Sequence, residues 1–334
     1  MNQHLIYGDI GGTKTLLQMA EFEHGAIHEL DMQRYRNSEY ASFSDILCDF
    51  LDTVKTKHPC QAAAACFAVA GPIADQRVNL TNLSWQIDAA EIAHAFSIPR
   101  VMLLNDFEAA ALAVDLLSPA DWVTLQEGYA QAQTMRVILG AGTGMGVAWL
   151  VWQKDHYQPI PTEAGHIDFA PVNALQLRLL EALQKKFHHV SVERLLSGAG
   201  LTQIFNFLQS NTVESHKIAS LPLDEDNGAA ITTLAIEHKH PNAIKALEIF
   251  TEIYGAFAGN LALTGLCRNG VYIAGGIAPK ILKYLQTGNF MRAFCDKGRF
   301  SGLLREIPVK VITHPAVSLL GAKRKVQDLS HLQG

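Results

Sequence analysis

A glycine-rich turn lies close to the start of the chain, between two apolar runs. Residues 5–7 and 16–19 flank the segment Gly8-Asp9-Ile10-Gly11-Gly12-Thr13, which predicts a strand, a tight turn and a second strand. Glycine allows several backbone N–H groups to face one point, and such a concave turn binds anions. The Asp9 carboxylate could lie beside a phosphate only if a metal ion is present. The motif therefore indicates nucleotide phosphates with Mg²⁺, and an ordinary hairpin turn is the alternative.

Two better-known phosphate-binding glycine loops do not match this segment. A Walker loop requires G-x-x-x-x-G-K-[ST] followed by a helix, but Gly8 and Gly12 are too close, and Thr13 intervenes before Lys14. The dinucleotide-binding fingerprint also opens a helix, whereas a strand-like run follows here. The sequence assigns no role to Lys14.

Composition limits the kind of protein. A length of 334 residues suggests two domains, since one domain takes about 150. The chain is 49% hydrophobic and 18% charged, as in ordinary globular proteins, and its net charge of −5 disfavours a nucleic-acid or membrane partner. The first residues predict no signal peptide. The five cysteines include no C-x-x-C pair, so we expect reduced core residues in a cytoplasmic protein.

Strand-like and helical segments alternate along the chain, which predicts an α/β fold. A second strand, glycine turn and strand spans residues 137–151, with Gly142, Thr143 and Gly144 at its tip. It resembles the first hairpin and forms a weak internal repeat, although a flexible hairpin is the alternative. A later strand, 270–277, contains Gly275-Gly276, where a flat group could approach the backbone.

Polar residues with possible chemistry follow one buried strand. Asn105 and Asp106 come directly after the strand predicted at 101–104 and precede an alanine-rich helix. Ligands of open α/β sheets gather beyond the carboxyl ends of the strands, and an aspartate there can accept a proton. The same two residues would also form a good helix N-cap, and the sequence does not separate these hypotheses.

Two further segments carry polar candidates. Glu163 and His166 form a Glu-x-x-His pair, but no second pair completes a carboxylate metal site, and the glycine and prolines nearby disfavour a helix. A loop with a carboxylate and an imidazole suits recognition of several hydroxyl groups. Glu193 can be interpreted as a first-turn glutamate that complements a helix dipole.

Taken in order, these motifs resemble bacterial glucokinases, within the hexokinase–actin–heat-shock-chaperone superfamily. The resemblance covers roughly residues 7–321. It implies two α/β domains of the duplicated actin-like ATPase (ribonuclease-H-like) type with an interdomain cleft. The small domain would comprise residues 1–117 with a returning C-terminal helix over 316–334, and the large domain residues 118–315.

The resemblance also implies a reaction, the ATP-dependent phosphorylation of D-glucose at its 6-hydroxyl at the entry to glycolysis. Asp106 would be the catalytic base, and Asn105, Glu163, His166 and Glu193 would bind the other sugar hydroxyls. The ATP phosphates would be held by Gly8, Asp9, Ile10, Gly11, Gly12, Thr13, Gly142, Thr143 and Gly144, with Asp9 near Mg²⁺ through water. Gly275 and Gly276 would approach the adenosine.

Some properties remain alternatives or expectations. No cysteine cluster follows His166, unlike in a related group of repressors and kinases, so we expect no zinc site. The alternatives are a kinase for fructose, mannose or an amino sugar and, less favoured, a non-enzymatic sugar sensor of the same fold. We expect glucose and ATP as ligands, no nucleic-acid or membrane partner, and a homodimer.

Overall fold

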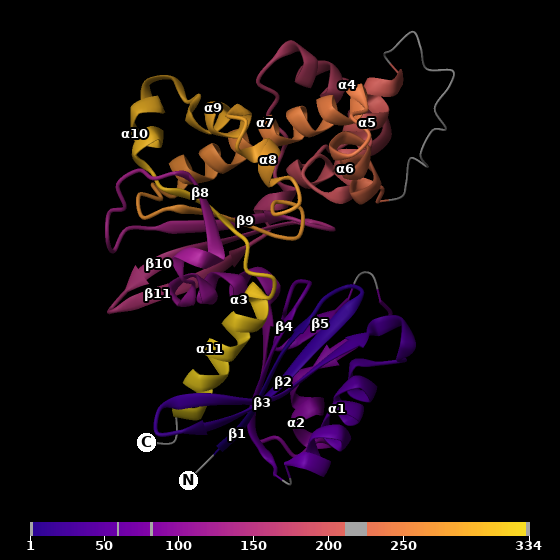
Figure 1. Cartoon of the computed structure of the whole chain (residues 1–334), viewed down its shortest axis with the longest axis vertical. Helices are drawn as coiled ribbons and strands as arrows, with labels where there is room; N and C mark the ends of the chain where they lie inside the picture. Colours follow the sequence, from indigo (N-terminus) through magenta and orange to yellow (C-terminus); the bar gives the residue numbers. More distant parts are fainter. Residues whose placement is uncertain (1–2, 59, 81–82, 211–225, 332–334) are drawn as a thin grey trace. The chain divides into compact units, whose positions relative to one another are not determined.

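Two compact units make up the chain. The computed structural model describes residues 3–58, 60–80, 83–210 and 226–331. Unit 1 comprises Met1–Leu117 and His314–Gly334, and unit 2 comprises Ser118–Thr313. Each unit has its own sheet with helices packed on it, so the predicted α/β class is confirmed (Figure 1).

The sheet of unit 1 has five strands in the order β3-β2-β1-β4-β7. The first three form an antiparallel meander, whereas β4 and β7 run parallel to β1. Both strands of the predicted first hairpin, β1 and β2, are present, and β3 is an edge strand that the sequence did not reveal. The strands are β1 (Gln3–Ile10), β2 (Lys14–Glu23), β3 (Ala26–Arg36), β4 (Ala62–Val69) and β7 (Val101–Asn105).

Side chains that alternate along β1 build two cores in unit 1. Ile6 and Ile10 pack on one face with α1 (Phe43–Lys57) and α2 (Ala89–Ala95). Leu5 and Tyr7 pack on the other face with α3 (Asp106–Ala113) and α11 (Val317–His331). Figure 1 shows α11, in yellow, beside α3. The last three residues of the helix predicted at 316–334 lie outside the described residues.

The sheet of unit 2 has six strands in the order β11-β10-β9-β12-β13-β8. An antiparallel meander is again followed by two parallel strands, and β8 adds an antiparallel edge. The first five strands therefore repeat the order of unit 1, which confirms the internal repeat suggested by the two glycine hairpins. The strands are β8 (Trp122–Gln126), β9 (Arg136–Ala141), β10 (Met145–Gln153), β11 (His156–Thr162), β12 (Val271–Ala274) and β13 (Val309–Ile312).

A long apolar helix, α7 (Pro241–Thr264), fills the centre of the helical layer of unit 2. Its neighbours are α4 (Ala174–Phe187), α5 (Gly198–Ser210), α6 (Gly228–Ile236) and α9 (Asn289–Cys295). The shorter elements are β5 (Arg77–Asn79), β6 (Gln86–Asp88), α8 (Leu282–Leu285), α10 (Ser301–Glu306) and the 3₁₀ turns η1 (Asn37–Glu39), η2 (Val114–Leu116), η3 (Pro119–Asp121), η4 (Ala164–His166), η5 (Val192–Arg194) and η6 (Gly298–Phe300).

The cysteines only partly follow the core prediction. All five are free thiols, and Cys66 and Cys267 are buried as expected. Cys48, however, is exposed on α1, and Cys60 and Cys295 are half-buried, so the prediction that all are core residues is wrong. Within the described ranges, no helix is both long enough and apolar enough to cross a bilayer.

Candidate active site

The first glycine turn, between β1 and β2, is held by a buried asparagine. Gly11 N donates to Lys14 O at 3.0 Å, which closes the turn. Asn37 Nδ2 donates to Gly11 O at 2.8 Å, and its Oδ1 accepts from Thr15 Oγ1 at 2.8 Å. Asn37 N also donates to Thr13 O at 3.1 Å. The conformation of the tip is therefore fixed from inside unit 1.

Among the described residues, this turn leaves two amide donors and a carboxylate without protein partners. In the part of the chain that the structure describes, the amides of Gly12 and Thr13 form no hydrogen bond. Asp9 is half-buried, and burial raises the pKa of its carboxyl to about 6. Amide donors can bind phosphate oxygens, and a nearby cation would favour the charged form of Asp9. The donor set therefore fits a phosphate with Mg²⁺.

Gly8 and Ile10 also lie in β1, and the structure gives both a packing role. A Cβ at Gly8 would lie 2.6 Å from Leu17 Cδ2 and 3.0 Å from Phe67 Cδ1. Ile10 is fully buried in the core below α1. Their contact with ATP stays a prediction.

The second glycine turn, between β9 and β10, has a similar construction. Gly142 N donates to Gly144 O at 2.8 Å. The amides of Thr143 and Gly144 have no hydrogen-bond partner among the described residues. Both predicted hairpins thus present two successive amide donors at the tip, as an anion-binding turn requires.

A cavity of about 290 Å³ lies beside this second turn, within unit 2. Helices α5 and α6 both begin at it, which places the positive ends of two helix dipoles there. Gly275 has φ +82°, and a Cβ there would overlap the Ala141 backbone, so glycine is required where the loop after β12 meets β9. The lining residues are Gly142, Thr143, Gly198, Leu201, Asp226, Gly228, Ala229, Thr232, Gly276, Ile277 and Lys280.

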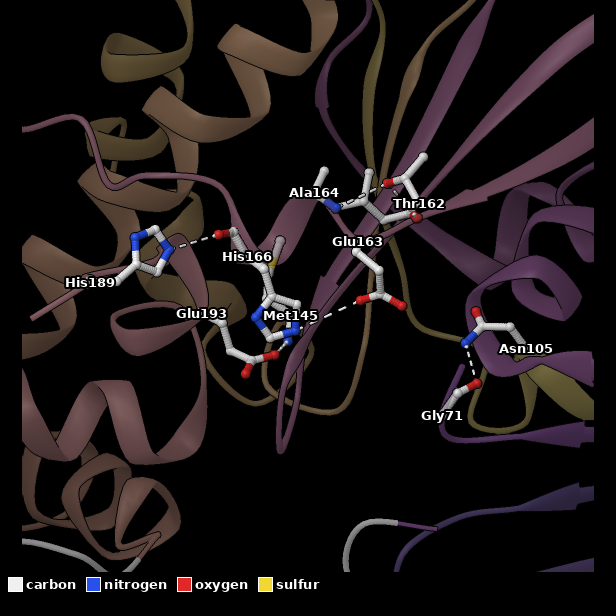
Figure 2. A network of polar contacts seen from close by, with 10 residues as sticks. Gly71, Asn105, Met145, Thr162, Glu163, Ala164, His166, His189 and Glu193 are labelled. Atoms are coloured by element: carbon white, nitrogen blue, oxygen red, sulfur yellow. Dashed lines mark hydrogen bonds and ion pairs between the residues drawn. The ribbon is translucent and has the colours of Figure 1, made fainter. Parts of the chain in front are cut away.

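Asn105, at the end of β7, is the N-cap of α3. Its Oδ1 accepts from Phe107 N at 2.9 Å and from Glu108 N at 3.3 Å, and its Nδ2 donates to Gly71 O at 3.1 Å. Figure 2 shows the contact with Gly71. The N-cap hypothesis is therefore confirmed for Asn105, and its predicted contact with sugar stays a prediction.

Asp106 is the first residue of α3 and is half-buried. Its Oδ1 accepts from Phe107 N at 3.0 Å, and its backbone oxygen accepts from Ser318 Oγ of α11 at 3.2 Å. The capped helix start and α11 thus fix the backbone of Asp106. This aspartate lies at the carboxyl end of a parallel strand, where the sequence placed it.

Glu163 and His166 lie at either end of η4 in unit 2. The His166 Nε2 atom is 3.7 Å from the Glu163 carboxylate, and both side chains are exposed. A Cβ at Gly165 would overlap the backbone oxygen of Met145, so η4 packs directly on the start of β10. Figure 2 shows Glu163 and His166 facing each other across this turn.

Glu193 connects η5 to the second glycine hairpin. Its carboxylate accepts from Met145 N at 2.9 Å, immediately after the glycine tip (Figure 2). Val192 N also donates to Ile167 O at 3.0 Å, which ties η5 to the segment after His166. Glu193 lies in the first turn of η5, which is a 3₁₀ turn of three residues, so only a short helix dipole is available to its carboxylate. Unit 2 therefore brings Glu163, His166 and Glu193 onto connected segments beside the second turn.

A comparison with known proteins decides the family. The family model for glucokinase matches residues 6–329. The chain belongs to the glucokinase family. The glucokinase of Nostoc punctiforme is 41% identical, and that of Trichormus variabilis 40%; each alignment covers 95% of this chain and 97% of the relative. A glucokinase structure from an Antarctic psychrotroph is 29% identical with a TM-score of 0.83 and covers 98% of this chain and 99% of that one. The resemblance and the duplicated actin-like ATPase fold are both confirmed.

Sequence reasoning missed several residues at the cavity of this glucokinase-family chain. Asp226, Thr232 and Lys280 belong to no motif, since three separate elements bring them together. The glycines at the first positions of α5 and α6, Gly198 and Gly228, were a sequence signal for this cavity. A Cβ at Gly228 would lie 2.8 Å from Gly198 Cα, so both glycines allow the two helix starts to meet.

No cluster of metal ligands adds to these candidates. Within the described ranges, no three or more His, Cys, Asp or Glu residues are placed to hold a metal ion together.

Proposed function

We propose that this chain transfers the γ-phosphoryl group of ATP to the 6-hydroxyl of D-glucose, which yields ADP and glucose 6-phosphate. The observation that carries this proposal is the cavity beside the second glycine turn, in a chain whose family is glucokinase. Helices α5 and α6 begin at this cavity and Gly142 and Thr143 of the second glycine turn line it, and helix N-termini favour the binding of phosphate groups. We assign the nucleoside of ATP to this cavity.

We assign the role of general base to Asp106. The 6-oxygen of glucose forms a bond to the γ-phosphorus, the bond from that phosphorus to the β–γ bridging oxygen breaks, and its electron pair leaves with ADP. The proton of the hydroxyl passes to the Asp106 carboxylate. Phosphoryl transfer depends mainly on positioning and charge neutralisation, and a base adds about 10²- to 10⁴-fold. The fixed backbone of Asp106 supports this role.

The sugar ligands in this proposal are Asn105, Glu163, His166 and Glu193. Carboxylates accept hydrogen bonds from hydroxyls, whereas imidazole and amide groups can donate or accept. Such groups discriminate strongly between sugars, because a missing hydroxyl leaves one of them unpaired. The link from Glu193 to Met145 supports placing sugar recognition next to the phosphate-binding turn.

Both glycine turns are assigned to the ATP phosphates, and Asp9 to Mg²⁺ through water. When bound, Mg²⁺ neutralises charge on the phosphates and orients them. The half-buried Asp9 carboxylate, without a partner in the described part of the chain, supports this assignment.

A coupled assay of purified protein with Mg-ATP and a panel of hexoses tests the proposed function. We expect the highest kcat/KM with D-glucose, compared with fructose, mannose and glucosamine. A clearly higher kcat/KM with another sugar would show that this sugar, and not glucose, is the substrate. Sugar binding without any sugar phosphate formed would instead indicate a sensor.

Two further properties belong to this proposal. We expect a homodimer, which sedimentation velocity at micromolar concentration would show as twice the mass of the chain. We also expect a cytoplasmic location, where ATP is available, and cell fractionation would test it.

A further inference from the structure

A second cavity, of about 300 Å³, lies beside the first glycine turn and within unit 1. Its wall includes the Asp9 carboxylate and two basic residues, Lys14 and Arg34. The proposed function gives neither basic residue a role. The remaining lining residues are Gly11, Thr13, Leu16 and Pro315.

The register of β2 and β3 explains why both cations reach one cavity. Arg34 lies opposite Leu16, and Arg36 lies opposite Lys14. Residues two apart in a strand point to the same face of a sheet, so Lys14, Leu16 and Arg34 share one face. Lys14 is also the first residue after the glycine tip, which brings its charge close to the backbone amides of Gly12 and Thr13.

The two cations differ from several other basic side chains of unit 1, which form ion pairs. Lys57 pairs with Asp31 at 2.5 Å, Lys323 with Glu29 at 2.7 Å, and Arg36 with Glu39 at 4.0 Å. Over the residues that the structure describes, neither Lys14 nor Arg34 has a carboxylate within ion-pair distance. Two exposed positive charges in one cavity, with amide donors at its edge, form a site for an anion with several oxygens.

We propose that Lys14 and Arg34 bind the phosphoryl group in transit from ATP to the sugar. This inference rests on the proposed function, which assigns ATP phosphates to both glycine turns, and it places the γ-phosphate at the first. Charge is spread over three oxygens of that group as the bond to the β–γ bridging oxygen breaks. The guanidinium of Arg34 can contact two of these oxygens, and the Lys14 ammonium can neutralise the third. Both are then catalytic residues.

The test compares Lys14→Met, Arg34→Met and the double variant with Arg36→Met. The last is a matched control, because Arg36 lies on the same strand and face and has the same charge but does not line the cavity. Steady-state kinetics give kcat and the KM for glucose. Calorimetry with Mg-tripolyphosphate and with ADP measures binding to the full chain, and melting curves report folding.

We expect kcat to fall at least about tenfold in each single variant, with the KM for glucose changed less than about twofold. Affinity for tripolyphosphate falls at least about tenfold in the double variant, while affinity for ADP, which lacks the third phosphate, stays within about twofold. Arg36→Met behaves as the unmodified chain. Unchanged melting temperatures, expected for exposed side chains, attribute these losses to the site.

A double variant that keeps both the unmodified kcat and the tripolyphosphate affinity would overturn the inference. Equal losses of kcat and of tripolyphosphate affinity in Arg36→Met would also overturn it, because the effect would then come from the net charge of the protein and not from the cavity. If a single methionine variant has a lowered melting temperature, the corresponding glutamine variant, Lys14→Gln or Arg34→Gln, is used in its place, because its side chain is polar and uncharged. If the unmodified chain phosphorylates no hexose, the proposed function fails, whereas selective loss of tripolyphosphate binding would still support the anion site.

Discussion

Neighbouring residues at the end of β7 have separate tasks. The side-chain oxygen of Asn105 caps the N-terminus of α3. The next residue, Asp106, is the first residue of this capped helix. Glu193 combines both kinds of task, because it accepts a hydrogen bond from Met145 N and is a proposed sugar ligand. Its two functions can be separated by substitution.

Replacing Glu193 with glutamine keeps an oxygen that can accept from Met145 N but removes the charge. We expect the KM for glucose to rise about tenfold, with the melting temperature unchanged. Glu193→Ala should also destabilise the protein by about 1–3 kcal/mol, because a partly buried amide loses its acceptor. Steady-state kinetics and thermal melts check both. If Glu193→Gln keeps the original KM, Glu193 is not a sugar ligand.

At the scale of elements, the sequence predicted the two glycine hairpins and the alanine-rich helix after Asn105, because apolar runs and glycine positions are local signals. It missed β3, whose polar residues and sheet-edge position give no apolar run. It also missed that Lys14 and Arg34 line one cavity, which depends on the register between β2 and β3. Lys280 and Asp226 likewise reach one cavity only through tertiary packing. The motif residues were predictable, whereas the residues that complete each cavity were not.

The packing of α11 on α3 supports the backbone of Asp106. A Cβ at Gly321 of α11 would overlap the backbone oxygen of Ala109, so Gly321→Ala must separate the helices. We expect destabilisation of about 1–3 kcal/mol and reduced kcat. Gly302→Ala is the control, because nothing lies within 4 Å of a Cβ there, and helix propensity should stabilise it slightly. Equal melting temperatures for the two variants would contradict this packing.

On the scale of the whole molecule, the two units repeat one strand order, and each presents a glycine turn whose tip amides have no hydrogen-bond partner among the described residues. Our proposed assignment uses both units, with the base in unit 1 and Glu163, His166 and Glu193 in unit 2. The first turn carries the half-buried Asp9 carboxylate, which our proposal assigns to Mg²⁺.

Removal of Mg²⁺ tests that link. In excess EDTA we expect the rate of sugar phosphorylation to fall at least about 100-fold, because the phosphate charges lose a cation that contributes several kcal/mol. Glucose affinity, measured by calorimetry, should be unchanged, since no sugar ligand depends on the metal. Full activity in EDTA would contradict the assignment of Asp9.

In our proposal, Asp106 takes the proton from the sugar hydroxyl. The most direct measurement is single-turnover phosphorylation of glucose by Asp106→Asn, because asparagine keeps the shape but cannot accept the proton. We predict a rate at least about 100-fold lower, with glucose and ATP affinities within about threefold of the unmodified chain. A rate close to that of the unmodified chain would contradict it.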